Sequence, residues 1–172
     1  MARNIEIKAR IESVEAMAVK VAALANHGPI DITQDDTFFV CMHGRVKLRT
    51  VSPTEGQLIF YQRANQVGPK ESFFVLAPTA SPDALREVLS LAYGQAGRVR
   101  KHRTLYRVGR TRIHLDRVEH LGDFLELEVE LSEGERVEQG MEEAHNLMAS
   151  LGIATAQLIE GAYVDLLAQH RA

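Results

Sequence analysis

Cysteine is nearly absent from this chain of 172 residues, which contains Cys41 and no second thiol. An intramolecular disulfide and a zinc site built from several cysteines are therefore both excluded. Such sparing use of cysteine is typical of proteins that work in a reducing compartment, and we expect a cytoplasmic location.

Long apolar runs and a surplus of positive charge are also missing. No stretch is long enough to cross a bilayer, and the N-terminal segment becomes charged at Arg3 and Glu6 without an apolar signal core. The formal net charge is −3 and the pI is about 6.2. Because a global basic field is missing, we expect neither general nucleic-acid binding nor membrane binding, and any bound anion must be met by a local cluster of cations.

The remaining composition is that of an ordinary globular protein, with 45% hydrophobic and 25% charged residues. We predict one domain over residues 1–172, since no repeat, low-complexity tract or linker divides the chain. Period-two alternation, turn residues and helical spacing predict the elements. The predicted strands are 3–11, 37–42, 45–51, 57–63, 72–76, 98–108, 111–118 and 123–131, and the predicted helices are 13–26, 81–94, 135–151 and 155–169.

Six stretches alternate charged and aliphatic residues at period two. Successive strand side chains point to opposite faces, so each stretch gives one charged row and, in most of them, one aliphatic row. In a single strand such a pattern is usually a solvated sheet face. An exposed face has no need to segregate its signs, whereas here carboxylates crowd the first and last strands and cations fill those between. The stretches are Asn4–Arg10, Arg45–Arg49, Leu58–Arg63, Val99–Leu105, Arg112–Asp116 and Phe124–Glu130.

A face with this many ions must line a wet cavity or bind counter-charges, because burying unpaired ions is costly. About eight antiparallel strands can form an open sheet, a sandwich or a barrel. An eight-stranded barrel leaves an interior about wide enough for side chains or one small ligand. We therefore predict an α+β fold, in which an eight-stranded antiparallel β-barrel encloses a charged tunnel and helices pack outside.

Carboxylates on the inward rows predict a divalent metal site. The candidate ligands are Glu6, Asp116, Glu126 and Glu128, with Glu130 at the end of its row. Hard cations such as Mg²⁺ or Mn²⁺ prefer carboxylate oxygens together with water and substrate phosphate. We expect three or four of these carboxylates to meet in one cavity and to hold Mg²⁺ or Mn²⁺ as the cofactor.

Cations on the same face predict a polyanionic ligand. Arginine offers fork-shaped donors that match phosphate oxygens, and many cations in one cavity suit a ligand with several negative charges. A triphosphate with its metal is the economical candidate, because positioning and charge stabilisation are most of what phosphoryl chemistry needs from a protein. The inward cations are Lys8, Arg10, Arg45, Lys47, Arg49, Arg63, Lys101, Arg103 and Arg112.

At these residues the chain resembles the CYTH family, also called the triphosphate tunnel metalloenzymes, which includes class IV adenylyl cyclases, thiamine triphosphatases and inorganic tripolyphosphatases. The family's first strand carries Glu-x-Glu-x-Lys, and Asn4, Glu6 and Lys8 occupy its three positions with two matches. The resemblance continues along the chain to the closing segment Tyr163–Leu167. The pairs that carry it are Lys47 with Arg49, Lys101 with Arg103, Arg112 with Asp116, and Glu126 with Glu128. It implies a tunnel of eight antiparallel strands, a triphosphate held by basic residues, and one or two Mg²⁺ or Mn²⁺ ions on acidic ones.

The resemblance also implies a role for each matching residue. The catalytic residues it implies are Lys8, Glu6 and Arg112. The residues implied to bind the triphosphate, such as ATP or tripolyphosphate, are Lys8, Lys47, Arg49, Arg63, Lys101, Arg103 and Arg112. The implied metal ligands are Glu6, Asp116, Glu126 and Glu128. His114 is either a base or, more commonly, a histidine that hydrogen-bonds a neighbour.

Asn4 stands where the family has its first glutamate. A neutral amide can give one oxygen to a metal but cannot act as a base. Hydrolysis needs an activated water, whereas cyclisation uses the ribose hydroxyl of the substrate, so Asn4 favours a class IV adenylyl cyclase-like reaction from ATP to cyclic AMP and pyrophosphate. The alternatives are a triphosphatase acting on tripolyphosphate or thiamine triphosphate, and a module that binds polyphosphate or nucleotide without turnover. The organic group on the triphosphate and the oligomeric state, a homodimer included, stay open.

Overall fold

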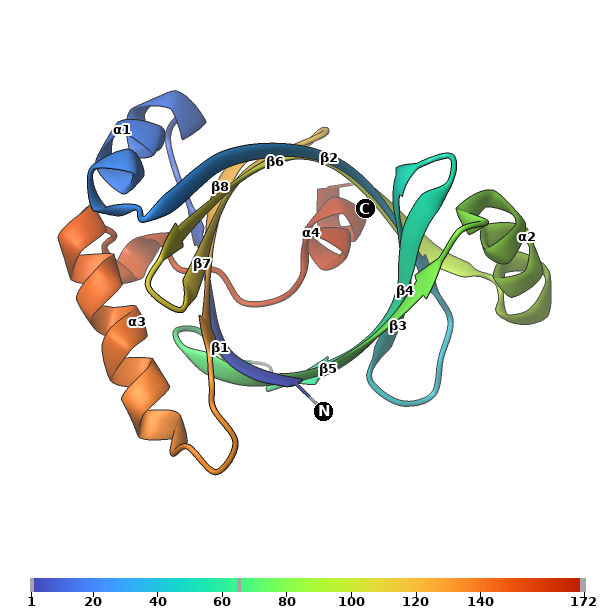
Figure 1. Ribbon diagram of the computed structural model, residues 1–172. Coiled ribbons are helices and arrows are strands. Elements are labelled where there is room, and N and C mark those ends of the chain that lie inside the picture. Colours follow the sequence, from blue (N-terminus) through green and yellow to red (C-terminus); the bar gives the residue numbers. More distant parts are fainter. Residues whose placement is uncertain (1, 65, 171–172) are drawn as a thin grey trace.

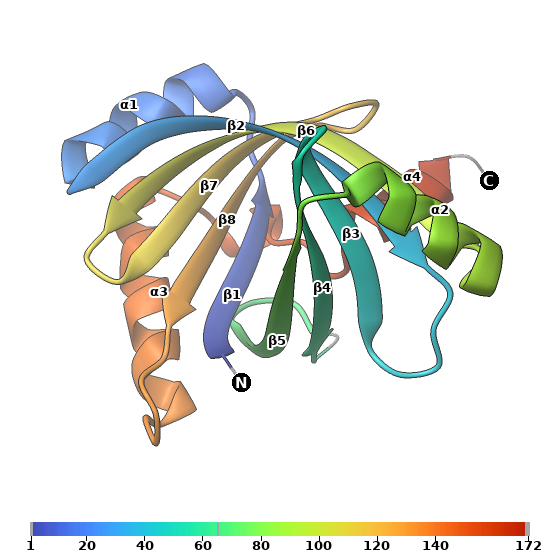
Figure 2. The ribbon, with the colours of Figure 1, turned by 45° about the vertical axis from the view of Figure 1, so that its right-hand side comes forward.

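The fold is a closed antiparallel barrel with helices around it (Figures 1 and 2). The computed structural model describes residues 2–64 and 66–170, so that Met1, Asn65, Arg171 and Ala172 of the predicted domain lie outside the described residues. The strands are β1 (Ala2–Arg10), β2 (His27–Phe39), β3 (Arg45–Ser52), β4 (Glu55–Arg63), β5 (Lys70–Thr79), β6 (Gln95–Val108), β7 (Thr111–Val118) and β8 (Gly122–Glu130). The helices are α1 (Val14–Leu24), α2 (Pro82–Tyr93), α3 (Val137–Leu151) and α4 (Tyr163–His170), with a 3₁₀ turn at Thr155–Gln157.

The strands follow one another around the barrel in the order β1-β5-β4-β3-β2-β6-β7-β8, and β8 closes on β1. Closure removes both sheet edges, so every strand is hydrogen-bonded to a neighbour on each side. The predicted eight-stranded α+β barrel is confirmed. Of the described helices, none is long and apolar enough to cross a membrane.

The aliphatic rows of β1, β7 and β8 face outward and form the main core under α1 and α3. Ser13 caps α1 by accepting a hydrogen bond from the backbone N–H of Ala16, at 3.2 Å. Gly140 lets α3 approach β1, because a Cβ at this position would collide with Ile5 and Leu131. The core residues beneath the two helices include Ile7, Val14, Met17, Val21, Ile113, Leu115, Leu125, Leu127, Met148 and Leu151.

Two predicted elements differ from the structure, and the first is β2. The sequence predicts a strand at 37–42, but β2 begins at His27 and ends at Phe39. The first half of β2 exposes Ile30 beside polar residues, so it lacks a clean period-two pattern. Pairing with β6 along the whole length of β2, from Arg107 to Gln95, supplies the stabilisation that local sequence does not reveal.

The second difference is the C-terminal segment. The sequence predicts one helix at 155–169, whereas the chain makes a 3₁₀ turn, runs extended beside β1 and starts α4 only at Tyr163. Leu158 bridges to Ala9, and the N–H of Ile159 bonds to the carbonyl of Lys8 at 2.9 Å. In Figure 1, which looks along the barrel, α4 is seen inside the ring of strands. It packs on inward side chains of three strands, Phe38, Val99 and Phe124, and so covers one end of the barrel instead of its outer wall.

Candidate active site

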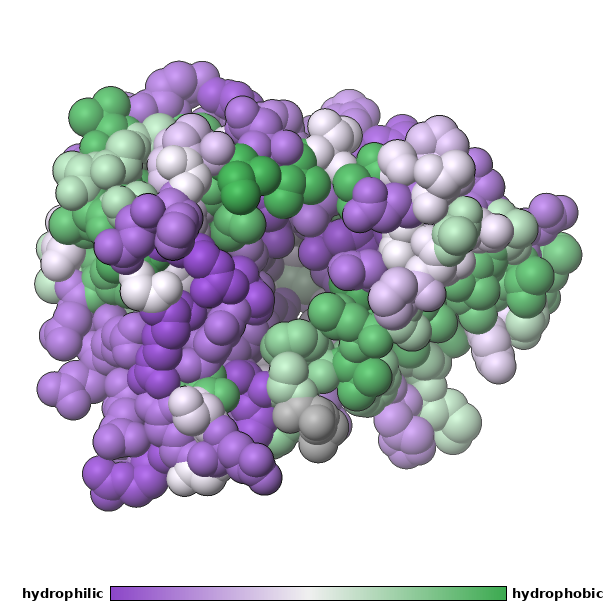
Figure 3. All heavy atoms as spheres, viewed as in Figure 1, coloured by the Kyte–Doolittle hydropathy of each residue, from purple (hydrophilic) through white to green (hydrophobic). Residues whose placement is uncertain are grey.

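The barrel encloses a cavity of about 1120 Å³, which includes space open to solvent. Figure 3 shows the molecule hollowed at its centre, with hydrophilic residues around much of the opening. All seven cations predicted to bind phosphate line this cavity, as do three of the four predicted metal ligands. The lining residues from those predictions are Glu6, Lys8, Lys47, Arg49, Arg63, Lys101, Arg103, Arg112, Glu126 and Glu128.

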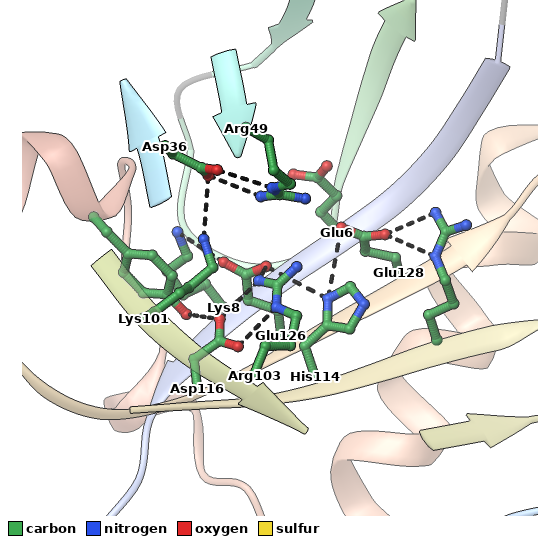
Figure 4. Close-up of polar contacts among 12 residues, drawn as sticks. Glu6, Lys8, Asp36, Arg49, Lys101, Arg103, His114, Asp116, Glu126 and Glu128 are labelled. Atoms are coloured by element: carbon green, nitrogen blue, oxygen red, sulfur yellow. Dashed lines mark hydrogen bonds and ion pairs between the residues drawn. The ribbon is translucent and has the colours of Figure 1, made fainter. Parts of the chain in front are cut away.

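Three of the cations contact one buried carboxylate, Asp36 on β2, and Figure 4 shows two of them, Arg49 and Lys101. Arg49 donates two hydrogen bonds to Asp36, of 2.9 Å and 2.8 Å, and Lys47 donates one of 3.0 Å. Lys101 lies 3.3 Å from the same carboxylate. Burial alone raises the pKa of Asp36, but the charges of Arg49, Lys101 and Lys47 outweigh it and hold that pKa well below the ordinary value.

Asp36 is the functional residue that sequence reasoning missed. It falls within residues 27–36 of β2, the part that the sequence did not predict as strand. A signal was present, because Gln34, Asp36 and Phe38 alternate with Asp35 and Thr37 and thereby form an inward row. Reading that row as strand would have placed a carboxylate opposite the basic row of β3.

The acidic wall lies on β1 and β8, and its carboxylates are also paired. Glu126 receives Lys8 at 3.1 Å and Arg103 at 3.0 Å. Arg112 binds Oε2 of Glu128 through two nitrogens, at 2.8 Å and 3.0 Å. These contacts fix the carboxylates before any ligand arrives, which reduces the reorganisation that binding requires.

Glu6 differs from Glu126 and Glu128 in the direction of its pKa shift. Arg63 approaches it at 3.1 Å. Burial raises the pKa of Glu6, and repulsion from Glu128 raises it further in spite of Arg63. By contrast, Lys8 and Arg103 overcome the effect of burial and hold the pKa of Glu126 well below its ordinary value. The wall is therefore short of positive charge at Glu6, where a divalent cation would relieve the repulsion.

Asp116 takes a different position from the other predicted metal ligands. It is completely buried and does not line the cavity. Arg103 binds both of its oxygens at 2.7 Å, and the hydroxyl of Tyr163 donates to Oδ2 at 2.8 Å. These contacts orient Arg103 toward Glu126, while the metal role of Asp116 stays a prediction.

His114 on β7 stands between the two carboxylates of β8 and lines the cavity. Its Nδ1 lies 3.8 Å from Oε2 of Glu126 and 3.9 Å from Oε1 of Glu128. The three side chains can present one ligand atom each within 4.8 Å of one another. Burial, and then the charge of Arg103, lowers the pKa of His114 below its ordinary value. A neutral imidazole beside two carboxylates is a donor set that can hold a metal.

Three sequence-based assignments fall away from the centre of the cavity. Arg10 is exposed and stacks over the ring of Phe124, at 4.8 Å from its centroid. Arg45 binds both oxygens of Asp165 on α4 and thereby ties β3 to the helix that covers the barrel end. Glu130 pairs with Arg107 and Arg112 outside the cavity lining. All three therefore act at the rim.

Asn4 lines the cavity in the place where the family motif has a glutamate. It stands opposite Ser72 in β5 and Glu130 in β8. Its Oδ1 and the hydroxyl of Ser72 are buried without a hydrogen-bond partner among the described residues. Unpartnered buried oxygens normally mark a missing ligand or water, so this end of the acidic wall fits a bound cation or its hydration shell.

Part of the wall of β4 and β5 is apolar, and the sequence did not predict this apolar patch. Ile59, Phe74 and Leu76 line the cavity, and Ile59 and Leu76 pair across the two strands. Ile59 also stands opposite Lys47, so the apolar wall adjoins the cation cluster. The cavity therefore offers an apolar face, a cationic face and an acidic face to one ligand.

A closed eight-stranded barrel whose lumen carries paired cations and carboxylates defines the triphosphate tunnel architecture. The sequence matches the CYTH domain family over residues 2–163, and the chain belongs to this family. The resemblance drawn from the first-strand motif and the charged pairs is thus confirmed, and membership agrees with the expectation of an enzyme.

Several known proteins are similar to this chain. Adenylate cyclase CyaB of Aeromonas hydrophila is 26% identical over 175 residues, which cover 96% of this chain and 89% of that protein. The PH1012 protein of Pyrococcus horikoshii OT3 has the same fold, with a TM-score of 0.83 at 23% identity over 95% of this chain and 98% of that one. HpAC1 from Hippeastrum, described as having a dominant triphosphatase activity, shares the fold with a TM-score of 0.68 at 14% identity, covering 99% and 96%.

Proposed function

We propose that this protein is a metal-dependent enzyme that binds ATP in the barrel and converts it to cyclic AMP and pyrophosphate, as class IV adenylyl cyclases do. The observation that carries the choice of substrate is the apolar wall of Ile59, Phe74 and Leu76 beside the cation cluster. An inorganic polyphosphate has no apolar group that could pack against this wall, whereas a nucleoside triphosphate would bury its base there. The similarity to an adenylate cyclase supports the same choice.

The phosphate chain would lie along the cations. Asp36 holds Arg49, Lys47 and Lys101 together, so their donors are already gathered on one side of the cavity. Arg63 and the other arginines provide donors toward the acidic wall. Bidentate guanidinium contacts match phosphate oxygens, and a preassembled cluster loses little entropy when the ligand binds.

The acidic wall would hold Mg²⁺ or Mn²⁺. Glu6, Glu126 and Glu128 supply carboxylates, and the unpartnered Oδ1 of Asn4 supplies a neutral oxygen. When bound, the ion would neutralise charge on the phosphate oxygens. The raised pKa of Glu6 and its repulsion from Glu128 support this placement, because both are relieved by a divalent cation.

Cyclisation itself would need a proton acceptor and charge stabilisation. The ribose 3′ oxygen bonds to the α-phosphorus, the bond from that phosphorus to the bridging oxygen breaks, and pyrophosphate leaves with the electron pair. Glu6 would take the hydroxyl proton, since its carboxylate lines the cavity and a positioned carboxylate can act as a general base. Lys8 and Arg112 would stabilise the charge that develops on the phosphates.

A triphosphatase is the second candidate. Two observations support it. The number of cations suits tripolyphosphate even without an organic group, and the fold is similar to that of HpAC1. The deciding experiment incubates the purified protein with ATP or tripolyphosphate and with Mg²⁺ or Mn²⁺, followed by chromatography of the products. Cyclic AMP with pyrophosphate supports the cyclase, orthophosphate from either substrate supports the hydrolase, and binding without any product would leave a ligand-binding module.

A further inference from the structure

We propose that His114 is a direct metal ligand through Nδ1, so that the site on β7 and β8 contains nitrogen as well as oxygen and prefers Mn²⁺, Co²⁺ and Zn²⁺ to Mg²⁺. This inference rests on the proposed metal dependence and adds to it the identity of a ligand and the class of ion selected. Glu126 and Glu128 supply the two oxygens of the same face.

The spacing of the three ligand atoms fits one ion better than it fits hydrogen bonds. Nδ1 of His114 lies 3.8 Å from Glu126 and 3.9 Å from Glu128, and both separations exceed hydrogen-bond reach. Two atoms that each lie about 2.0–2.2 Å from a shared ion are separated by roughly 3–4 Å. An ion can therefore sit among these atoms with little movement of the strands that carry them.

Nδ1 of His114 has no other role in the described structure. His114 is 5% exposed, and its Nδ1 has no hydrogen-bond partner among the described residues. A buried ring nitrogen without a partner is costly in a folded protein and calls for a missing ligand. Figure 4 shows the ring directed at the carboxylates of β8.

Of the two carboxylate oxygens nearest the ring, Oε1 of Glu128 has no other polar contact among the described residues, whereas Oε2 of Glu126 also accepts a hydrogen bond from Arg103. Arg112 occupies Oε2 of Glu128, which leaves the other oxygen, Oε1, turned to His114. Lys8 and Arg103 contact the two oxygens of Glu126 and fix that side chain in turn. Such supporting contacts are what usually orient metal ligands in proteins.

The donor type decides the selectivity. Mg²⁺ is a hard ion that prefers oxygen ligands and octahedral geometry, and it gains little from imidazole. First-row transition ions accept nitrogen readily, and their affinity for such sites generally rises from Mn²⁺ through Co²⁺. A site made only of carboxylates would discriminate less between these ions and Mg²⁺, so His114 strengthens the preference of the tunnel for transition ions.

Metal ligation can be measured directly, without nucleotide and without turnover. Pulsed EPR on the Mn²⁺-loaded protein detects coupling to a ligand nitrogen, and calorimetry gives the affinities for Co²⁺ and Mg²⁺. The variant His114→Gln keeps an oxygen donor and removes the nitrogen, and His114→Asn serves if the first variant does not fold. His102→Gln is the matched control, because His102 is half-exposed on β6, 3.6 Å from Asp31 and outside the cavity.

We expect nitrogen coupling in the wild type and in His102→Gln, and none in His114→Gln. Co²⁺ affinity should fall at least about tenfold in His114→Gln, since even outer partners of a ligand contribute that much, while Mg²⁺ affinity changes little. A wild-type spectrum without nitrogen coupling, or coupling that survives in the His114 variants, would overturn the inference. Product analysis with nucleotide is independent, so the proposed cyclase reaction can stand or fail separately.

Discussion

Arg49 and Asp36 stand directly opposite each other on β3 and β2 and form two hydrogen bonds, Nε to Oδ1 at 2.9 Å and Nη2 to Oδ2 at 2.8 Å. The side chain of Asp36 is 1% exposed, and that of Arg49 is 15% exposed. Since Lys47 and Lys101 also contact Asp36, one carboxylate orders a cluster of three basic side chains and offsets part of their charge. The tunnel is thus built with an internal anion on the side where the phosphates are proposed to bind.

The first prediction concerns Asp36→Asn. Removing a buried charge that compensates three cations should lower the free energy of unfolding by about 3–5 kcal/mol. Tripolyphosphate should then raise the melting temperature more in the variant than in the wild type, because the ligand replaces the missing anion. The control is Asp35→Asn, on the opposite face of the same strand, whose part-exposed pairs with Arg98 and Arg100 should contribute only about 0–1 kcal/mol. Equal effects of the two variants would contradict the role assigned to Asp36.

The second prediction separates two carboxylates of the acidic wall by thermal and chemical denaturation. The pKa of Glu6 is raised in the folded protein, so its contribution to stability is present at low pH and is lost as the pH rises above its ordinary pKa. At pH 7, Glu6→Gln should therefore stabilise the metal-free protein by about 0.5–2 kcal/mol.

Glu126→Gln should do the opposite. Its pKa is depressed, so its contribution is present at pH 7 and is lost as the pH falls. The change leaves Lys8 and Arg103 without their partner, and we expect a loss of about 3–5 kcal/mol. Both variants should bind Mn²⁺ more weakly in calorimetry. Shifts in stability of the same sign would show that the pairing seen in this wall does not govern its energetics.

The third prediction concerns Asn4→Glu. A carboxylate there would join Glu6 on the acidic wall, facing the unpartnered hydroxyl of Ser72 in the opposite strand. The added charge should strengthen Mn²⁺ binding and raise hydrolysis of tripolyphosphate more than cyclic AMP formation, because hydrolysis needs a base for an outside water whereas cyclisation already has its nucleophile. Rates of both reactions and a Mn²⁺ titration test this, with Asn4→Gln as the uncharged control. Identical rates and titrations in all three proteins would mean that this position contacts neither metal nor water.

The fourth prediction concerns proton uptake. Burial first, and then the charge of Arg49, lowers the pKa of Lys47 to about 7. Above pH 7 this lysine is largely neutral in the empty tunnel, and a bound phosphate raises its pKa again, so binding must take up protons. The affinity for tripolyphosphate should therefore fall by up to about tenfold per pH unit between pH 7 and 9. Calorimetry at pH 8 in buffers of different ionisation enthalpy counts the protons, and Lys47→Arg should reduce the uptake because arginine stays charged. An enthalpy independent of the buffer would exclude this coupling.

Much of the barrel could be predicted because strand periodicity is a local property. The alternating rows of β1, β3, β7 and β8 show their inward and outward faces within a few residues, and the segregation of charge between strands indicates a closed lumen. Residues 27–36 of β2 were not predicted as strand, since the stabilisation of this segment comes from the long ladder with β6 and not from its own pattern. The interruption of the predicted helix 155–169 before Tyr163 was not foreseen for a related reason. The extended segment there is held by contacts with Ala9 and Lys8 of β1, far away in the chain.

The sequence by itself determined most of the charges that enter the tunnel, since the side chains of a strand must alternate between its two faces and all seven predicted phosphate-binding cations line the cavity. Only the tertiary structure decided which charges meet. The register of β2 with β3 and β6 brings Asp36 into contact with Arg49 and Lys101. Asp116 is buried in contact with Arg103 and with the hydroxyl of Tyr163, at the start of α4. Pairing across a barrel depends on register and closure, and these are set by contacts between residues far apart in the chain, which no local pattern encodes.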